Sequence, residues 1–484
     1  MPADPVRLGL VSLGCDKNTV DSERMLAALI GQGAERVADL SEADVILVNT
    51  CGFIDAAKEE SIEALLAAGR LKRHGRCRSV VAVGCMVERY RDELTPALPE
   101  VDLFLGLRDL DRLVPELVER GHLPGAADTD RPHPGDRAPL GSRHVSYLKV
   151  SEGCDHGCAF CAIPLWRGRH RSFDAARLVA EAQRLEAQGA VEVNLVAQDL
   201  AHYGRERRDG TDITTLLRRL LDETAIPWFR LLYIYSAGLR EPLVELMADE
   251  PRLLPYIDMP IQHASDSVLE RMRRPERADA LRRKIRWLRA TVDELTLRTT
   301  VLVGFPGETD DEFRELVEFL DEASFDRLGA FAFSPQEGTR AAGLDAFVPE
   351  DVAAARLEEI VEVQRAVSAE RMAGEVGGVR PAIVDRPAEP DDPVVAALGP
   401  GEPPGGPALG RIASQADDVD GVTVLWGAAG LGPGAIVEAR IERAADYDLA
   451  GRVERVVRSA PAARPVGAAA RPLPVLGLET AWGR

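Results

Sequence analysis

In the first hundred residues, short runs of apolar residues alternate with segments whose apolar positions recur at helical spacing. The apolar runs predict β-strands at 6–14, 44–49, 79–83 and 101–105. The segments between them predict helices at 20–32 and 55–72, the first capped by Asn18 or Asp21. Strands and helices that alternate in this way favour a parallel sheet with helices on its faces, so we expect an α/β domain here.

The length and the charge of the chain limit the classes of protein to consider. Its 484 residues are enough for about three domains. Asp and Glu outnumber Lys and Arg by 79 to 59, so the net charge is −20. This argues against a protein that coats nucleic acid non-specifically and leaves room for a basic partner. No apolar run approaches roughly 18 residues and no secretory signal precedes the first strand, so we expect a cytoplasmic protein without a membrane span.

The chain has seven cysteines, and three of them occupy equivalent positions in the predicted sheet. Cys15, Cys51 and Cys85 each follow a predicted strand, beside a glycine in every case. Because the carboxyl ends of parallel strands lie at one edge of a sheet, these thiols can meet there as metal ligands. The alternative is three unrelated core cysteines, since free cysteine is often buried. Cys77 lies in an arginine-rich loop outside this pattern and stays unassigned.

The other three cysteines form a compact group. Cys154, Cys158 and Cys161 follow the predicted strand 147–150 with the spacing C-x3-C-x2-C. Iron–sulfur clusters with full cysteine ligation use four thiolates, so three would leave one iron of a four-iron cluster open for another ligand. The alternative is zinc, with His156 as the fourth ligand. Closed zinc sites, however, favour two ligand pairs that lie further apart in the sequence.

Several motifs together resemble those of the methylthiotransferase family within the radical S-adenosylmethionine (SAM) superfamily. The C-x3-C-x2-C spacing with Phe160 before the last cysteine is typical of the superfamily. The narrower resemblance rests on SLGCDKNTVDSE (12–23), NTCGF (49–53), VGCM (83–86), YLKVSEGCDHGCAFCAIPLWRG (147–168), PIQHAS (260–265), GFPGETDDEF (304–313) and FSPQEGTRAAGL (333–344). It covers about the first 370 residues and resumes near the C-terminus.

The resemblance implies an α/β multidomain fold. An N-terminal methylthiotransferase domain with a parallel α/β sheet is expected at 1–125, followed by a linker at 126–144 and a radical SAM core at 145–373. A small β-barrel of the TRAM type is expected at 374–453. Within it, the Pro/Gly-rich insertion 386–407 should be a flexible loop, and 454–484 should be a flexible tail.

The core is expected to form the partial β/α barrel of radical SAM enzymes, and its residue pattern agrees. Strands are predicted at 147–150, 191–196, 230–235, 296–303 and 328–333, and helices at 174–188, 239–248, 277–294 and 308–323. The loops after these strands contain Gln198, Gln262, His263 and 304–307. Because barrel strands carry functional groups at their carboxyl ends, we expect these residues on one rim.

The resemblance also implies two four-iron, four-sulfur (4Fe–4S) clusters. Cys154, Cys158 and Cys161 would hold the cluster that binds SAM, and Cys15, Cys51 and Cys85 an auxiliary cluster that carries sulfur. We expect SAM contacts from Phe160, Gln198 and Arg298, although Arg298 could equally be a solvated charge at a strand end. Relatives often have a serine before the glutamine, where this chain has Ala197. An electron donor such as flavodoxin or ferredoxin and a sulfur donor are implied partners.

Two branches of the family differ in substrate: one modifies an adenosine of transfer RNA, the other the β-carbon of an aspartate in ribosomal small-subunit protein 12. The frame SLGC-x-KN-x-VDSE, the segment FSPQEGT and the late DYDL resemble the ribosomal branch. Residues 374–450 contain five arginines, no lysine and thirteen acidic residues, a net charge of −8. A module that grips RNA should be basic, so the charge independently favours a basic ribosomal protein, free or in the small subunit.

Three further interpretations remain open from the sequence. A non-catalytic iron–sulfur or zinc protein of ribosome assembly would bind metal without cleaving SAM. A single-cluster radical SAM enzyme of another purpose would hold about four irons rather than eight. The run RRKIRWLR at 282–289 could be a nucleic-acid patch, although such a run is more often one solvated helix face.

Overall fold

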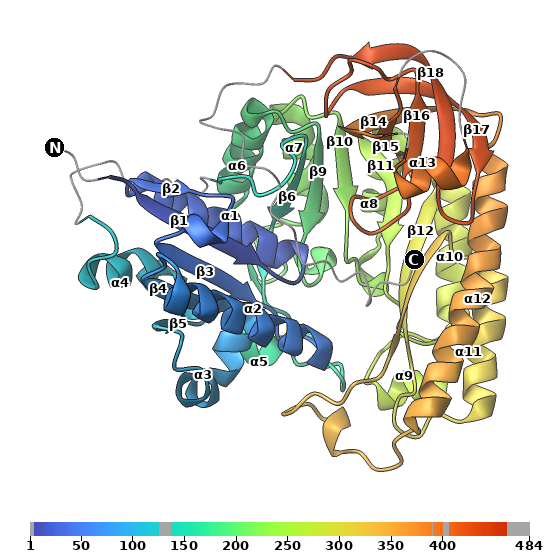
Figure 1. The fold of residues 1–484 in the computed structure, drawn as a ribbon. Helices are drawn as coiled ribbons and strands as arrows, with labels where there is room; N and C mark the ends of the chain where they lie inside the picture. The colour runs from blue at the N-terminus through green and yellow to red at the C-terminus, as the bar shows by residue number, and fades with distance from the viewer. Residues whose placement is uncertain (1–3, 125–136, 390, 400–405, 462–484) are drawn as a thin grey trace.

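The N-terminal domain is a five-stranded parallel sheet in the order β2-β1-β3-β4-β5, as Figure 1 shows in blue. The structure is a computed structural model that describes residues 4–124, 137–389, 391–399 and 406–461. The elements are β1 (Val6–Ser12), α1 (Asp16–Gly31), β2 (Ala34–Arg36), η1 (Leu40–Glu42), β3 (Val45–Thr50), α2 (Asp55–His74), β4 (Ser79–Gly84), α3 (Cys85–Ala97), β5 (Leu103–Leu105), η2 (Leu107–Arg112) and α4 (Leu113–Glu119). The predicted α/β sheet is confirmed, with the short edge strand β2 as an addition.

The start of helix α1 differs from the sequence prediction. The helix begins at Asp16 with Cys15 as its N-cap residue, and no side chain caps it. Asn18 and Asp21, the predicted caps, lie inside the helix and are buried. The Asn18 amide donates hydrogen bonds to the Leu13 and Thr50 carbonyls, at 2.9 and 3.2 Å. The predicted cap was wrong because these polar groups bind strand ends and another domain instead.

The central domain is a six-stranded parallel sheet that curves without closing, in the order β13-β12-β11-β10-β9-β6. This confirms the expected partial barrel. Its elements are β6 (Val145–Lys149), β7 (Ser151–Glu152), α5 (Ile163–Arg167), β8 (Arg171–Ser172), α6 (Ala175–Gln188), β9 (Glu192–Val196), η3 (Leu200–His202), α7 (Ile213–Glu223), β10 (Trp228–Leu231), η4 (Ser236–Gly238), α8 (Glu241–Asp249), β11 (Leu253–Asp258), α9 (Asp266–Arg271), α10 (Ala278–Thr291), β12 (Thr296–Val303), α11 (Asp310–Ala323), β13 (Arg327–Ala332), η5 (Ala341–Gly343) and α12 (Glu350–Glu375).

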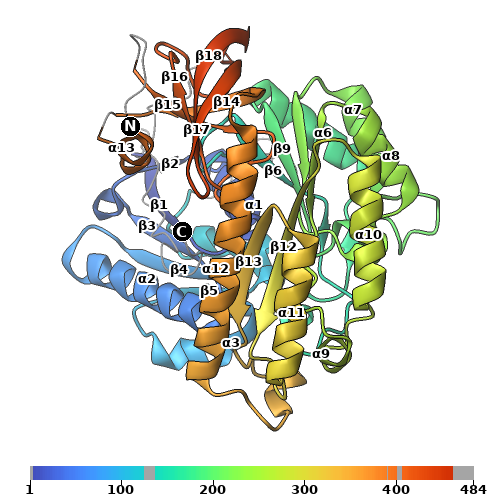
Figure 2. The same ribbon diagram turned by 90° about the vertical axis from the view of Figure 1, so that its right-hand side faces the viewer.

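The two faces of the central sheet have opposite character. Leu195, Phe229 and Val301 belong to the large apolar core under helices α6, α7, α8, α10 and α11 on the outer face (Figure 2). The alternate positions point to the other face because side chains alternate along a strand, and several of them are polar. Asn194 and Arg298 are two such residues, and both are buried. The polar inner face is therefore the surface on which a polar ligand can bind.

The C-terminal domain is a closed five-stranded barrel in the order β14-β15-β16-β18-β17, red and orange in Figure 1. Its elements are β14 (Val379–Pro387), α13 (Pro393–Leu398), β15 (Ala408–Ile412), β16 (Thr423–Trp426), β17 (Ile436–Ala444) and β18 (Leu449–Arg458). Buried contacts fasten it to the central domain: Arg411 Nη2 lies 2.8 Å from Glu192 Oε2, and Arg230 donates to the Ala413 carbonyl at 2.8 Å. The barrel thus packs against the central sheet.

Two expectations for the C-terminal region are corrected. The insertion 386–407 is not simply a flexible loop, because its described part contains helix α13. Val395 and Leu398 of this helix are buried against Leu409, Val424 and Trp426 of the barrel. The expected tail 454–484 begins too early, since strand β18 continues to Arg458. Residues 400–405 and 462–484 lie outside the described residues, as do 125–136 of the expected linker.

In the described part of the chain, no helix combines the length and the apolarity that a membrane span requires.

Candidate functional site

The three N-terminal cysteines all lie at the carboxyl edge of the first sheet. Cys15 precedes α1, Cys51 follows β3, and Cys85 begins α3 after β4. A Cβ atom at Gly14 would lie 3.0 Å from Cys51 Sγ, and the φ of Gly14 is +91°. Glycine is therefore required there, both for the backbone conformation and for the space beside the thiol. The predicted convergence of the three thiols agrees with this geometry.

Cys77 takes no part in this group. Its side chain is buried in the core formed by α2, β3 and β4, with Ile46, Leu65 and Val80 as neighbours. Its thiol donates a hydrogen bond to the Ser79 carbonyl at 3.3 Å. Cys77 is thus a core residue, which answers a question that the sequence left open.

The second cysteine group lies in the loop after β7, and backbone contacts hold this loop in place. The amide of Cys154 donates to the Gly168 carbonyl at 3.1 Å, and that of Ala159 donates to the Met272 carbonyl at 2.9 Å. A Cβ atom at Gly153 would lie 2.2 Å from the Arg169 carbonyl oxygen, and its φ is +79°. The loop therefore needs glycine before its first cysteine. The guanidinium of Arg274 lies 3.9 Å from Cys158 Sγ.

His156 lies between Cys154 and Cys158, but its ring bonds elsewhere. Its Nε2 is 2.8 Å from Asp199 Oδ2, and its ring stacks on Tyr235 with centroids 4.0 Å apart. Among the described residues, His156 forms a group of close ligand atoms with Asp199 and His202, and the three thiols form none with it. A single zinc ion needs its ligands close together. The arrangement therefore disfavours zinc bound by His156 and the three thiols.

A buried polar network connects the two cysteine groups. Arg167, six residues after Cys161, donates to Cys85 Sγ at 3.4 Å and to Asn18 Oδ1 at 2.6 Å. Its other nitrogen donates to Glu152 Oε1 at 2.8 Å, and Glu152 lies just before the second cysteine loop. The positive charges of Lys149 and Arg167 outweigh burial and lower the pKa of Glu152 well below its usual range. One guanidinium thus joins Cys85 of the N-terminal domain to Glu152 of the central domain, two residues before Cys154.

The residues expected to contact SAM have three different environments. Gln198 follows β9, and its Nε2 is 3.4 Å from Glu152 Oε1, while its Oε1 is buried without a partner in the described structure. Phe160 is packed partly against the small apolar cluster around Met272 and Phe305. Arg298 is neither exposed nor solvated, because its Nη1 lies 2.8 Å from Asp258 Oδ1 in a buried ion pair. The alternative of a solvated charge is therefore wrong.

The sequence interpretation missed several polar residues at this site. Asn194 is buried in the middle of β9, and neither of its amide atoms has a hydrogen-bond partner in the described structure. Lys17 places its ammonium 3.1 Å from the centroid of the Tyr233 ring, at the end of β10. A polar residue inside an apolar run, as in VEVNLV, was the available signal for Asn194. The sequence held no comparable signal for Arg167 and Lys17, because their roles depend on contacts between domains.

Tyr233 joins the N-terminal domain to the central sheet. Its hydroxyl donates to Asp16 Oδ2 at 3.1 Å, and its amide donates to Asp258 Oδ2 at 3.0 Å. Its φ of +64° is unusual for a residue with a large side chain. This backbone turn ends β10 at Leu231, four residues before the predicted end, and directs the ring toward helix α1.

The thiols of the folded apo-protein should react faster as the pH rises. Burial is the main cause that raises the pKa of Cys51 and Cys161 to about 12 and of Cys85 and Cys154 to about 11. Only the thiolate reacts, and below the pKa its fraction grows about tenfold per pH unit. Alkylation of these cysteines by iodoacetamide, followed by mass spectrometry, should therefore accelerate about tenfold per unit from about pH 7 to 9.

The denatured chain is the control for that measurement. Its thiols have a pKa of about 8.5, so their alkylation rate should level off above about pH 9. A folded apo-protein whose four thiols level off at the same pH would show that burial does not raise their pKa.

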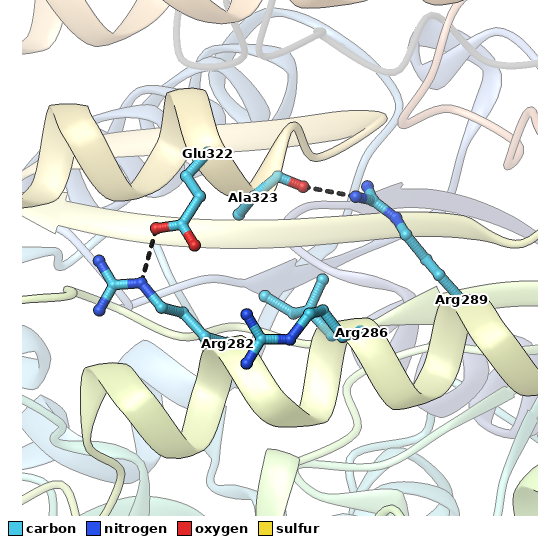
Figure 3. Close-up of a pocket in the computed structure, with 6 residues that line it drawn as sticks. Arg282, Arg286, Arg289, Glu322 and Ala323 are labelled. Carbon is cyan, nitrogen blue, oxygen red and sulfur yellow. Dashed lines mark hydrogen bonds and ion pairs between the residues drawn. The ribbon is translucent and has the colours of Figure 1, made fainter.

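A pocket on the outer helical layer is lined mainly by arginines. Figure 3 shows it between α10 and α11, lined by Arg282, Arg286 and Arg289 and enclosing about 150 Å³. Arg282 pairs with Glu322, and Arg289 donates to the Ala323 carbonyl at 2.7 Å. Leu281, Ile285 and Leu288 of the same helix are buried in the core. The run 282–289 is thus a helix with one packed face and one solvated face, as the simpler interpretation predicted.

Comparison with known proteins matches all three parts of the chain. Family models match residues 7–106 (uncharacterized protein family UPF0004), 148–320 (radical SAM superfamily) and 401–453 (TRAM domain). Ribosomal protein uS12 methylthiotransferase RimO of Desulforudis audaxviator is 44% identical over 458 residues, covering 93% of this chain and 98% of the relative. The protein of the same name from Anaeromyxobacter sp. strain Fw109-5 is 41% identical over 473 residues, covering 97% and 96%.

Among solved structures, the radical SAM methyltransferase TsrM from Kitasatospora setae with tryptophan and aza-SAM bound has a TM-score of 0.49. Its sequence is 15% identical, and the match covers 81% of this chain and 80% of that one.

Proposed function

The chain belongs to the RimO family of radical SAM methylthiotransferases, and from this we propose that it transfers a methylthio group to the β-carbon of an aspartate in ribosomal protein uS12. The observation that carries the proposal is the placement of the two groups of thiols at one domain interface, where Arg167 donates to Cys85 and Cys85 packs in one cluster with Ala162, the residue after Cys161. A reaction that joins sulfur delivery to SAM chemistry needs two such sites next to each other.

The donor sets fit the two clusters that this family uses. Cys154, Cys158 and Cys161 would hold the SAM-binding 4Fe–4S cluster, and Cys15, Cys51 and Cys85 the auxiliary one. Three thiols without a close fourth ligand suit a cluster with one open iron better than a closed zinc site. When bound, the clusters would supply the electron for SAM cleavage and the sulfur, and SAM would supply the methyl group and the hydrogen abstraction from carbon.

The protein's own residues supply orientation and a dry environment. Both amide atoms of Asn194 and the Oε1 of Gln198 are buried without a partner in the described structure, and a polar ligand would supply the partner that such groups need. Arg167 donates to the Cys85 sulfur, and this charge-assisted contact stabilises a thiolate. Cys51 and Cys85 are buried, which keeps water from these two thiols, while Cys15 is exposed.

The charges of the C-terminal barrel support a protein substrate. The region 374–450 contains five arginines and no lysine. Each of these five arginines has a protein acceptor: Arg380 pairs with Glu375, Arg386 with Asp392, Arg411 with Asp385 and Arg440 with Glu454, and Arg443 donates to the Leu398 carbonyl. On β18 of the same barrel, Arg452 pairs with Glu442 and Arg455 with Glu438. We propose that uS12, free or in the small ribosomal subunit, binds in the cytoplasm, and that a flavodoxin-like or ferredoxin-like protein and a sulfur donor serve as further partners.

The test offers two substrates side by side. Anaerobically reconstituted protein receives SAM, a low-potential reductant and sulfide, together with recombinant uS12 or unmodified transfer RNA, and both are analysed by mass spectrometry. The proposal expects a methylthio mass gain on uS12 alone. A gain on an adenosine alone would move the chain to the transfer-RNA branch, and metal binding without SAM cleavage would favour a non-catalytic protein.

A further inference from the structure

Lys17 differs from the other buried lysine at the domain interface. Lys149 is 2% exposed, and its ammonium is paired with Asp21 and Glu152. Lys17 is 7% exposed, yet among the described residues no oxygen accepts a hydrogen bond or ion pair from its ammonium. In the described part of the chain its ammonium lies over the face of the Tyr233 ring. A desolvated ammonium without a hydrogen-bonded anion is costly, so a partner from outside the chain is the simplest way to complete the site.

The carboxylates near Lys17 already have other partners. Asp16 accepts a hydrogen bond from the Tyr233 hydroxyl at 3.1 Å. Asp258 pairs with Arg298 at 2.8 Å and accepts from the Tyr233 amide at 3.0 Å. Lys17 is attracted to Cys15, Asp16 and Asp258, but none of these three groups accepts a hydrogen bond from its ammonium. A carboxylate from a ligand would find a positive charge held in place and partly stripped of water.

The position of Lys17 limits which carboxylate that is. Lys17 lies two residues after Cys15, a member of the N-terminal thiol site, and contacts Tyr233 on the central sheet. It therefore lies between the sulfur site and the inner face of the partial barrel. In an aspartate side chain the β-carbon is bonded directly to the carboxyl carbon. A cation that holds the carboxylate here also holds the β-carbon next to the sulfur site, as positioning for reaction requires.

We propose that Lys17 binds the side-chain carboxylate of the substrate aspartate and thereby selects an acidic residue as the site of methylthiolation. This inference rests on the proposed function, because it assigns the substrate-binding group of that reaction. It makes Lys17 a specificity-determining residue. A substrate with a neutral side chain in the same place would leave the ammonium unpaired, and the enzyme would therefore discriminate strongly against it.

The experiment measures binding and SAM cleavage separately in the full reconstituted protein. The probes are recombinant uS12 and the same protein with asparagine in place of the modified aspartate. For the wild-type enzyme, the asparagine protein should bind about 10- to 100-fold more weakly. Lys17→Met should weaken binding of the aspartate protein by the same factor and leave binding of the asparagine protein unchanged within about 3-fold. Lys17→Arg, which keeps the charge, should retain part of the affinity.

Two controls separate this inference from its alternatives. Lys72→Met removes a surface lysine that pairs with Asp102 in the same domain, and it should change neither binding nor iron content. The KM for SAM and the substrate-free yield of deoxyadenosine should be unchanged in Lys17→Met. If Lys17→Met instead raises the KM for SAM and spares uS12 binding, the ligand is the SAM carboxylate and the inference is wrong.

Other outcomes also overturn it. Equal binding of both uS12 proteins by wild-type and Lys17→Met enzyme would show that Lys17 does not bind the aspartate. Loss of iron in both Lys17→Met and Lys17→Arg would assign Lys17 a structural role. If wild-type enzyme neither binds nor modifies uS12, the proposed function itself fails, which is a distinct result.

Discussion

Replacing Cys15 with alanine is expected to reduce the iron content from about eight to about four per chain and to abolish methylthio transfer, while SAM cleavage continues. Cys15 belongs to the N-terminal thiol site, and the second thiol site lies in the separate loop 154–161. Because the two sites use different residues, the loss of one ligand should empty one site only. Iron analysis and deoxyadenosine production under reducing conditions measure the two effects.

The matched control is Cys77→Ala. Cys77 is a buried cysteine of the same domain whose thiol bonds the Ser79 carbonyl, so its loss should cost stability alone and spare both iron content and transfer. Cys158→Ala should show the reverse of Cys15→Ala and abolish SAM cleavage. A Cys15→Ala protein that still transfers methylthio groups, or that stops cleaving SAM, would contradict the assignment of two independent sites.

Arg167→Met is expected to lower the free energy of unfolding by about 3–5 kcal/mol and to disturb the N-terminal cluster. The side chain of Arg167 is 3% exposed and pairs with Glu152 at 2.8 Å, while it also donates to Cys85 at 3.4 Å. Methionine would fill the space but leave the Glu152 carboxylate and the sulfur without this partner. Arg167→Lys should recover only part of the loss, because one ammonium cannot replace the planar fork that reaches both groups.

Denaturant unfolding of the apo-protein and the electron paramagnetic resonance signal of the reconstituted protein measure this prediction. Arg169→Met is the matched control two residues away, because the Arg169 side chain is 91% exposed and pairs only with Asp155. Its unfolding free energy should stay within about 0.5 kcal/mol of wild type. An Arg167→Met protein as stable as this control, with an unchanged signal, would show that Arg167 does not join the two sites.

The cysteine sites could be predicted because they depend on local order in the chain. A thiol placed directly after each of three parallel strands must reach one sheet edge, whatever packs around it. The members of the second group lie within eight residues, so they share one loop whatever the rest of the fold does. The helix predicted at 308–323 agrees with α11, which begins with a local capping box of Thr309 and Glu312.

The residues that sequence reasoning misjudged depend on distant partners. Asn18 and Asp21 have the chemistry of helix caps, but Arg167 and Lys149 of the central domain bind them instead. Arg298 is occupied by Asp258 of the neighbouring strand. The Pro/Gly-rich composition of 386–407 indicated a loop, yet Val395 and Leu398 pack against an apolar surface of the barrel. Each outcome was decided by tertiary contacts, which composition does not contain.

Transfer of a methylthio group to an aspartate of uS12 can be followed by tandem mass spectrometry of uS12 after reaction with reconstituted enzyme and SAM that carries a deuterated methyl group. We expect one modified residue, an aspartate, with the mass gain of one methylthio group on its side chain and the deuterated methyl in it. Deoxyadenosine production with unmodified uS12, or a methylthio group on another residue type, would show that this chain does not carry out the proposed reaction.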